Sequence, residues 1–273
     1  MTFSVLARDP ATGDLGIAVS SCILAVGRAV PNARPGVGVV AVQARSRRGL
    51  GTSLLSGLTE GTPPAELVRR AAHAAEDADR QIAVLDAAGA VAADTGQGSF
   101  PVSGHLVGEC FSVQGNMLAS AEVLPSMAQA FTAASGSLPD RLLAALTAGQ
   151  DAGGDLRGRQ SASLLVVSGS PATDEDDGVR MDLRVDDSAD PVAQLRMLRN
   201  LQRAYDESDY EMLAIFAPEG ARALYAALAA TRRGDRSGAK AALSAMRERP
   251  GWSAWLASMA GDSRLAAVSR LLD

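Results

Sequence analysis

The sequence TFSVLARDPATGDLGIAVS, residues 2–20, decides the fold of this 273-residue chain. Residues 2–7 and 15–20 favour β-structure, and the segment between them is rich in turn residues, which predicts an antiparallel hairpin. A third run, residues 37–43, is continuously apolar, as is typical of a strand buried on both faces. The first residues of the chain are therefore expected to lie inside a sheet.

Thr2 occupies an unusual place for a strand residue, one position after Met1. Methionine aminopeptidases generally remove an initial methionine that precedes a residue as small as threonine. Thr2 would then carry a free α-amine, whose ordinary pKa of about 8 allows it to act as the base that activates its own hydroxyl. The alternative is that Thr2 is a β-branched residue that opens an edge strand, and its position alone favours this alternative.

The composition sets limits on partners and location. Hydrophobic residues make up 47% of the chain and charged residues 21%, which is ordinary for a globular protein with a sizeable core. A net charge of -5 predicts no nucleic-acid or anionic-membrane partner, and no apolar run approaches the length of a membrane span. Because the first residues also lack a secretory pattern, we expect a cytoplasmic protein.

The rarest residues exclude several kinds of chemistry. Lys240 is the only lysine among 26 basic residues, so neither a phosphate-loop lysine nor a Schiff-base lysine can lie before it. Cys22 and Cys110 are too few for a disulfide framework, and no metal-ligand spacing is present. We therefore expect no metal and no cofactor.

Two histidines are the only candidates for a catalytic triad. His73 falls off the apolar stripe of a helix expected at residues 64–76 and is predicted to be a solvated helix residue. His105 follows residues 100–104 in what the pattern indicates is a loop between strands. It could contact a substrate or serve only the structure of that loop.

The order of the elements indicates the fold class. Hairpins alternate with paired helices, whereas a doubly wound parallel sheet would need a helix after nearly every strand. We therefore expect an α+β fold of two antiparallel sheets packed on each other with helices outside, a four-layer αββα sandwich. Further helices are expected at residues 49–58, 122–134 and 139–150, and further strands at 81–86, 91–94, 111–114, 161–167 and 179–185.

Polar residues at the ends of the expected strands are the candidate site residues. Ser21 would neighbour Thr2 across the hairpin. Gln114 and Asn116 flank Gly115, where the chain is expected to turn, and their amides could stabilise an oxyanion or simply form the turn. Asp155 and Arg159 could clamp a polar substrate, although an ion pair between them is the favoured interpretation.

Many short motifs of this chain resemble one known family, and together they extend from Thr2 to about Leu198. They are residues 2–4 with 7–10, 25–27 with 30–31, 36–41 with Gln43, 104–105, 114–118, 148–150, 153–155, 157–162 and 182–187. The chain is similar in these motifs to the domain of unknown function 1028 family, which is placed among the N-terminal-nucleophile (Ntn) hydrolase-like folds.

The resemblance implies the αββα sandwich and favours Thr2 as a nucleophile. Proteasome-like members of the wider fold place a lysine near the nucleophile, and this chain has none in its first 239 residues. An arginine such as Arg45 could supply positive potential there, but it stays protonated and cannot shuttle a proton. A pocket lined by Ser21, Gln43 and Asn116 would bring the reacting groups together.

The composition shifts to helix-forming residues after about Leu198, so we expect one domain at residues 1–200 and a helical appendage at 201–273. Part of the appendage, residues 227–243, looks like a tetratricopeptide-type helical hairpin. It is either a cap on the sandwich or a docking surface for a protein partner, with Trp252 and Trp255 as anchors.

Two functions of different classes follow. The first is an Ntn-type amidohydrolase of a small amide or peptide-like substrate, in which Thr2 attacks, Gln114 or Asn116 stabilises the oxyanion, and Ser21, Gln43, Arg45, His105, Asp155 and Arg159 contact the substrate. The second is a non-catalytic ligand-binding or scaffold protein on the same fold. In either case we expect a homo-oligomer.

Overall fold

The computed structural model describes residues 2–45, 49–72, 78–100, 102–247 and 250–258. The chain divides into two compact units, Met1–Arg196 and Met197–Asp273, which are taken separately below. None of the described helices is long and apolar enough to cross a membrane.

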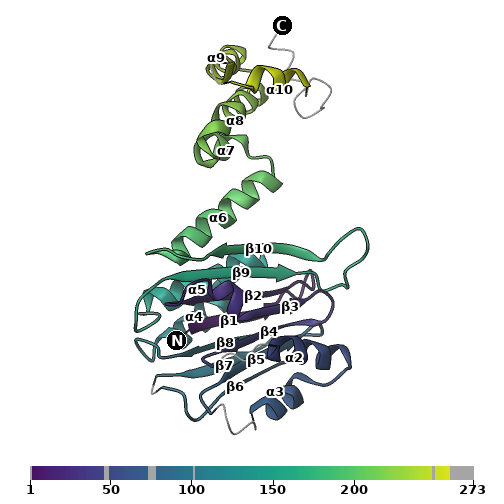
Figure 1. Ribbon diagram of the computed structural model, residues 1–273, viewed down its shortest axis with the longest axis vertical. Coiled ribbons are helices and arrows are strands. Elements are labelled where there is room, and N and C mark those ends of the chain that lie inside the picture. The colour runs from purple at the N-terminus through teal and green to yellow at the C-terminus, as the bar shows by residue number, and fades with distance from the viewer. Residues whose placement is uncertain (1, 46–48, 73–77, 101, 248–249, 259–273) are drawn as a thin grey trace. The chain divides into compact units, whose positions relative to one another are not determined.

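A six-stranded antiparallel sheet in the order β10-β9-β2-β1-β8-β7 forms one half of the first unit (Figure 1). The expected hairpin is its centre, because β1 pairs with β2 on one side and with β8 on the other. The strands are β1 (Thr2–Arg8), β2 (Leu15–Ser21), β7 (Gly104–Gly108), β8 (Phe111–Asn116), β9 (Ser161–Val167) and β10 (Val179–Val185).

The second sheet is also antiparallel, with four strands in the order β3-β4-β5-β6. These strands are β3 (Pro31–Arg34), β4 (Gly38–Gln43), β5 (Gln81–Asp86) and β6 (Val91–Thr95). Every residue of β4 is buried, as the continuously apolar run predicts. The expectation of a mixed fold with two antiparallel sheets is therefore confirmed.

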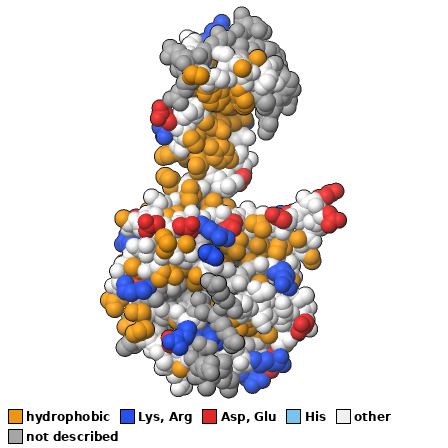
Figure 2. Space-filling model, in the orientation of Figure 1, with side chains coloured by type: hydrophobic (Ala, Val, Ile, Leu, Met, Phe, Trp, Pro, Cys, Tyr) orange, Lys and Arg blue, Asp and Glu red, His pale blue; other side chains and the backbone are white. Residues whose placement is uncertain are grey.

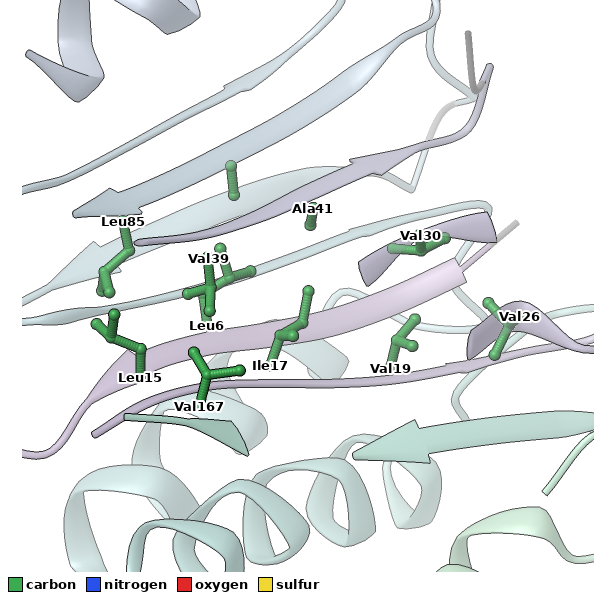
Figure 3. Packing of buried hydrophobic residues seen from close by; sticks show 11 residues of the cluster. Leu6, Leu15, Ile17, Val19, Val26, Val30, Val39, Ala41, Leu85 and Val167 are labelled. Atoms are coloured by element: carbon green, nitrogen blue, oxygen red, sulfur yellow. The ribbon is translucent and has the colours of Figure 1, made fainter. Parts of the chain in front are cut away.

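A hydrophobic core holds the two sheets together (Figure 3). Leu6, Leu15 and Ile17 of the first sheet pack against Val39 and Leu85 of the second, and all five are fully buried. Side chains on a strand alternate between its two faces, so Phe3 and Ser4 of β1 project to opposite sides of the first sheet. This alternation places Ser4 between the two sheets, where it bonds Gln43.

Helices pack on both sheets (Figure 1). Helices α2 (Leu50–Thr59) and α3 (Pro64–Ala72) bury Leu54, Leu55, Leu67 and Val68 against β4 and β5. Helices α4 (Val123–Ala133) and α5 (Leu138–Asp151) bury an apolar face that meets the six-stranded sheet at Phe3 and Gly16. The short α1 (Val26–Ala29) follows β2.

Several expectations about local structure were wrong. His105 lies on strand β7 and not in a loop. Strand β8 continues through Gly115 to Asn116, where a turn was expected, because both residues are held in register against β1. The short elements β3 and α1 were not predicted. His73 lies outside the described residues.

Strand β10 forms one edge of the six-stranded sheet, and its side chains alternate in sign. Arg180, Asp182 and Arg184 are all at least partly exposed, and Arg184 binds Asp182 in a two-bond ion pair at 2.9 Å. Exposed charges on an edge strand are typical of sheets that do not extend further.

The second unit is helical in its described part. Helix α6 (Pro191–Asp206) begins in the first unit and ends in the second, and it is followed by α7 (Tyr210–Phe216), α8 (Glu219–Arg232), α9 (Arg236–Arg247) and α10 (Trp252–Ser258). Two small cores stabilise this unit, centred on Leu213 and on Leu224 with Leu243. Hydrophobic side chains also gather on its surface (Figure 2), where Ile215 is 61% exposed. Residues 259–273 of the expected helical appendage lie outside the described residues.

Candidate functional site

Thr2 is the first residue of β1, the strand between β2 and β8. Its Oγ1 atom is 3.1 Å from the Oγ atom of Ser21, at the end of β2. On the other side Thr2 pairs with Asn116, the last residue of β8. The side chain is buried, with 4% of the residue exposed. Three residues expected at the site thus lie together because the two strand pairings place them side by side.

Next to Thr2, a series of hydrogen-bonded amides and hydroxyls connects the two sheets. Asn116 Nδ2 donates to Gln81 Oε1 at 3.0 Å, and Gln43 Nε2 donates to the same oxygen at 2.7 Å. The hydroxyl of Ser4 donates to Gln43 Oε1 at 2.8 Å and accepts a bond from Gln114 Nε2. We call these five residues, Ser4, Gln43, Gln81, Gln114 and Asn116, the amide network.

Gln81 is the central member of the amide network because it reaches both sheets. Its Nε2 donates to the backbone oxygens of Gly104 and Gly115 and to Thr95 Oγ1, at 2.8–2.9 Å. Thr95 Oγ1 is in turn 2.9 Å from Nδ1 of His105. His105 is thus connected to Asn116 through two intervening side chains.

The backbone leaves the site by strained turns. Ala44 follows Gln43 with a φ of 65°, and Met117 follows Asn116 with a φ of 49°. Ala25, four residues beyond Ser21, has a φ of 54°. Left-handed conformations at non-glycine residues cost of order 1 kcal/mol and occur often at functional sites. Strands β4 and β8 therefore both end beside the amide network in an uncommon backbone geometry.

Asp155 supports the same end of β2, but its ionic partner is not the expected one. The carboxylate binds Arg157 at 3.3 Å and accepts the backbone N–H of Cys22 at 2.8 Å. Arg159 instead pairs with Asp190 at 3.6 Å. The expected Asp155–Arg159 ion pair is therefore wrong, because the turn after Asp155 folds Arg157 back onto the carboxylate.

Arg45 lies just past the end of β4, with 61% of its side chain exposed, and pairs with Asp79 at 3.5 Å. It follows Ala44, so the chain carries a positive charge near the edge of the amide network and not within it. The network itself consists of neutral groups. No cluster of three potential metal-ligating side chains occurs in the part of the chain that the structure describes.

The sequence indicated Gln43, Gln114 and Asn116 but not Ser4, Gln81 or Thr95. A signal was available, because an uncharged polar residue in a buried apolar strand needs a hydrogen-bond partner. Gln81 opens β5 ahead of the apolar run 82–85 and is fully buried. Its partner could not be identified from sequence, since the pairing depends on how the two sheets stack.

The two tryptophans of the second unit lie on α10 and contact each other edge to face. Their ring centroids are 5.2 Å apart. Trp252 and Trp255 line a cavity of about 240 Å³ with Pro250 and Gly251. This cavity lies within the second unit and is separate from the amide network.

Comparisons with known proteins identify a similar solved structure and a family for the first unit. A crystal structure of protein SPO2555 from Silicibacter pomeroyi, described as a DUF1028 family model, matches with a TM-score of 0.66 and 33% sequence identity. The match covers 74% of this chain and 88% of that one. No curated protein matches the chain. The model of the family of unknown function DUF1028 matches residues 2–195, and the chain belongs to that family.

Proposed function

We propose that the chain is an Ntn-type amidohydrolase that acts on a small amide or peptide-like substrate once Met1 has been removed. The observation that carries this proposal is the contact between Thr2 Oγ1 and Ser21 Oγ at 3.1 Å beside the paired Asn116. A threonine fixed in this way at the start of a central strand would have its hydroxyl oriented before a substrate arrives.

The proposed reaction begins when the α-amine of mature Thr2 accepts the hydroxyl proton. Oγ1 then attacks the amide carbon, and the carbonyl oxygen becomes an oxyanion. The amine returns its proton to the leaving nitrogen as the C–N bond breaks, which leaves an ester on Thr2. Water hydrolyses this ester with the same amine as base, and the free threonine is restored.

Asn116 is the better placed of the two predicted oxyanion donors. Its Nδ2 uses one hydrogen for Gln81, and the second has no acceptor among the described residues. Gln114 lies two residues earlier on β8, opposite Ser4, and its amide is bonded to Ser4 and Ser112. We therefore assign Asn116 to the oxyanion and Gln114 to the positioning of the amide network.

The proposed fold is the αββα sandwich of the Ntn hydrolases. Support comes from the inter-sheet core, from α2 and α3 against one sheet, and from α4 and α5 against the other. The alternative, a ligand-binding or scaffold protein on this fold, is favoured by two observations. Thr2 is 4% exposed, and no lysine precedes Lys240 to stabilise the free amine.

The test is labelling of the purified full-length protein by a β-lactone, an electrophile that acylates nucleophilic threonines. Intact-mass measurement should show loss of Met1 and gain of one lactone, with the label located on Thr2. Thr2→Ala should abolish labelling, and Thr2→Ser should retain part of it because the nucleophile class is kept. Thr12→Ala, in the exposed β1–β2 turn, is the matched control and should label like the parent.

Retention of Met1 in the mature protein would rule out the free amine and with it the hydrolase. Undiminished labelling of Thr2→Ala would do the same. The binding-protein alternative would then replace it.

A further inference from the structure

A polar cavity lies in the first unit, apart from the amide network. It has a volume of about 190 Å³ and is formed where the end of α5 meets the start of α6. The lining residues are Thr147, Gln150, Asp151, Arg159, Asp190, Val192, Ala193 and Arg196. Phe3 and the end of α5 pack on the outer face of the six-stranded sheet, whereas Thr2 and Ser4 contact groups between the sheets.

Gln150 is the feature that points to a ligand. Only 6% of this residue is exposed, and its side-chain amide bonds to no other described residue. Gln150 lines the cavity, and its side-chain amide keeps a donor and an acceptor that no described residue pairs. The expected complement is a ligand with its own donor and acceptor.

Charges of both signs surround that amide. Asp151 and Arg196 are exposed and form no ion pair within the described part of the chain. Arg159 and Asp190 are 3.6 Å apart, with 42% and 52% of their side chains exposed. An ion pair this long and this exposed contributes little to stability, so a ligand can replace it at small cost. Two guanidinium groups and two carboxylates thus line one small cavity.

We propose that this cavity binds a free α-amino acid with a polar side chain. Arg196 and Arg159 would receive its carboxylate, and Asp151 and Asp190 its ammonium group. Gln150 would exchange two hydrogen bonds with a side-chain amide, because an amide offers one donor and one acceptor to another. A simple anion would meet both carboxylates and a simple cation both guanidiniums, so a zwitterion matches this charge pattern best.

The test is isothermal titration calorimetry of the full chain with the twenty α-amino acids, with L-glutamine as the first probe. We expect saturable one-site binding. Two analogues each remove one charge: glutaramic acid lacks the amine, and L-glutaminamide lacks the carboxylate. Each should bind at least ten-fold more weakly than L-glutamine if both charges are recognised.

Variants locate the site. Gln150→Leu and Arg196→Met should each weaken binding at least ten-fold, and Arg196 is exposed, so its replacement should leave folding intact. Arg184→Met is the matched arginine control on β10, and Thr2→Ala separates this cavity from the proposed active site. Both should bind like the parent. Absence of binding by all twenty amino acids, undiminished binding in both cavity variants, or loss of binding in Thr2→Ala would each overturn the proposal.

Discussion

The side chain of Gln81 makes more hydrogen bonds than that of any other residue of the amide network. Its carbonyl oxygen accepts from both Gln43 and Asn116, and its amide nitrogen reaches two backbone oxygens. A buried donor left without an acceptor costs the full desolvation of that group. The five side chains therefore depend on one another, and Gln81 is the residue whose loss affects most of them.

The first prediction is that Gln81→Leu lowers the free energy of unfolding by about 2–5 kcal/mol, because it strands two buried amide donors at once. Urea denaturation followed by circular dichroism measures it. Gln160→Leu is the control, since Gln160 makes one exposed bond to Asp187 and should change stability by about 0.5 kcal/mol or less. Equal effects in the two variants would contradict the role given to the network.

The second prediction concerns Ala44, which is exposed and has a φ of 65°. Glycine adopts this conformation without steric penalty, so Ala44→Gly should raise the free energy of unfolding by about 0.5–1 kcal/mol. Ala11→Gly, in an exposed turn without positive φ, should lower it or leave it unchanged. Thermal or urea unfolding of the two variants distinguishes strain at Ala44 from a general effect of glycine.

Helix α3 is stabilised near its first turn by one acid and two bases. Glu66 accepts from Arg69 at 2.7 and 2.8 Å and from Arg70 at 2.7 Å. These hydrogen bonds, first to Arg69 and then to Arg70, lower the pKa of Glu66 from 4.5 to about 2. A carboxylate at this position also interacts favourably with the helix dipole.

The third prediction follows from that lowered pKa. A carboxylate whose pKa is lower in the folded state stabilises the fold above its unfolded pKa, and this contribution disappears as the pH falls through the folded value. The stability difference between the parent and Glu66→Gln should therefore be full above about pH 4.5 and vanish towards pH 2. Urea denaturation at several pH values measures it.

Glu122→Gln is the control for that series, because Glu122 precedes α4 and forms no ion pair in the described ranges. At neutral pH its stability difference should be smaller than that of Glu66→Gln, because it breaks no hydrogen bonds to arginine among the described residues. A carboxyl NMR titration that gave Glu66 an ordinary pKa would contradict the prediction directly.

Sequence patterns identified the long elements because their signals are local. Strands β9 and β10 were predicted with the observed bounds, since the largely apolar run of β9 and the alternating run of β10 are bordered by turn residues. The missed elements β3, β7 and α1 have four or five residues, and β3 and β7 are only half-buried at best. Segments this short take their structure from the neighbours they pair with.

In the candidate site, too, local contacts could be predicted from the sequence and contacts between distant elements could not. The contact between Thr2 and Ser21 could be predicted, because a hairpin fixes which residues lie opposite each other. The bonds of Gln81 to Gln43 and Asn116 could not, since they depend on the stacking of two sheets. The ion pair of Asp155 with Arg157 also could not be predicted, because it depends on the conformation of the turn after Asp155.

At the scale of the whole molecule, the two units have separate cores. The inter-sheet core and the core under α2 and α3 contain no residue beyond Val167, and the two small helical cores contain none before Leu201. The family match also ends at residue 195. Each of these four hydrophobic clusters thus lies within one unit.

The fourth prediction is that a chain ending at Asp206, the last residue of α6, unfolds cooperatively. Residues 1–206 retain both sheets and their helices, so the melting temperature should lie close to that of the corresponding transition in the full chain. Differential scanning calorimetry of the two proteins tests this. An insoluble product or a gradual melt would show that the second unit is needed to complete the first.

The charged side chains of β10 limit how copies of this protein can associate. Another strand that docked on this edge would have to strip water from Arg180, Asp182 and Arg184 and place its own residues among them. Continuous sheets across two subunits, and the fibres that grow from them, are therefore disfavoured at this edge. Copies of this chain that met at β10 would therefore have to contact each other through side chains, and such a contact would not propagate as a shared sheet does.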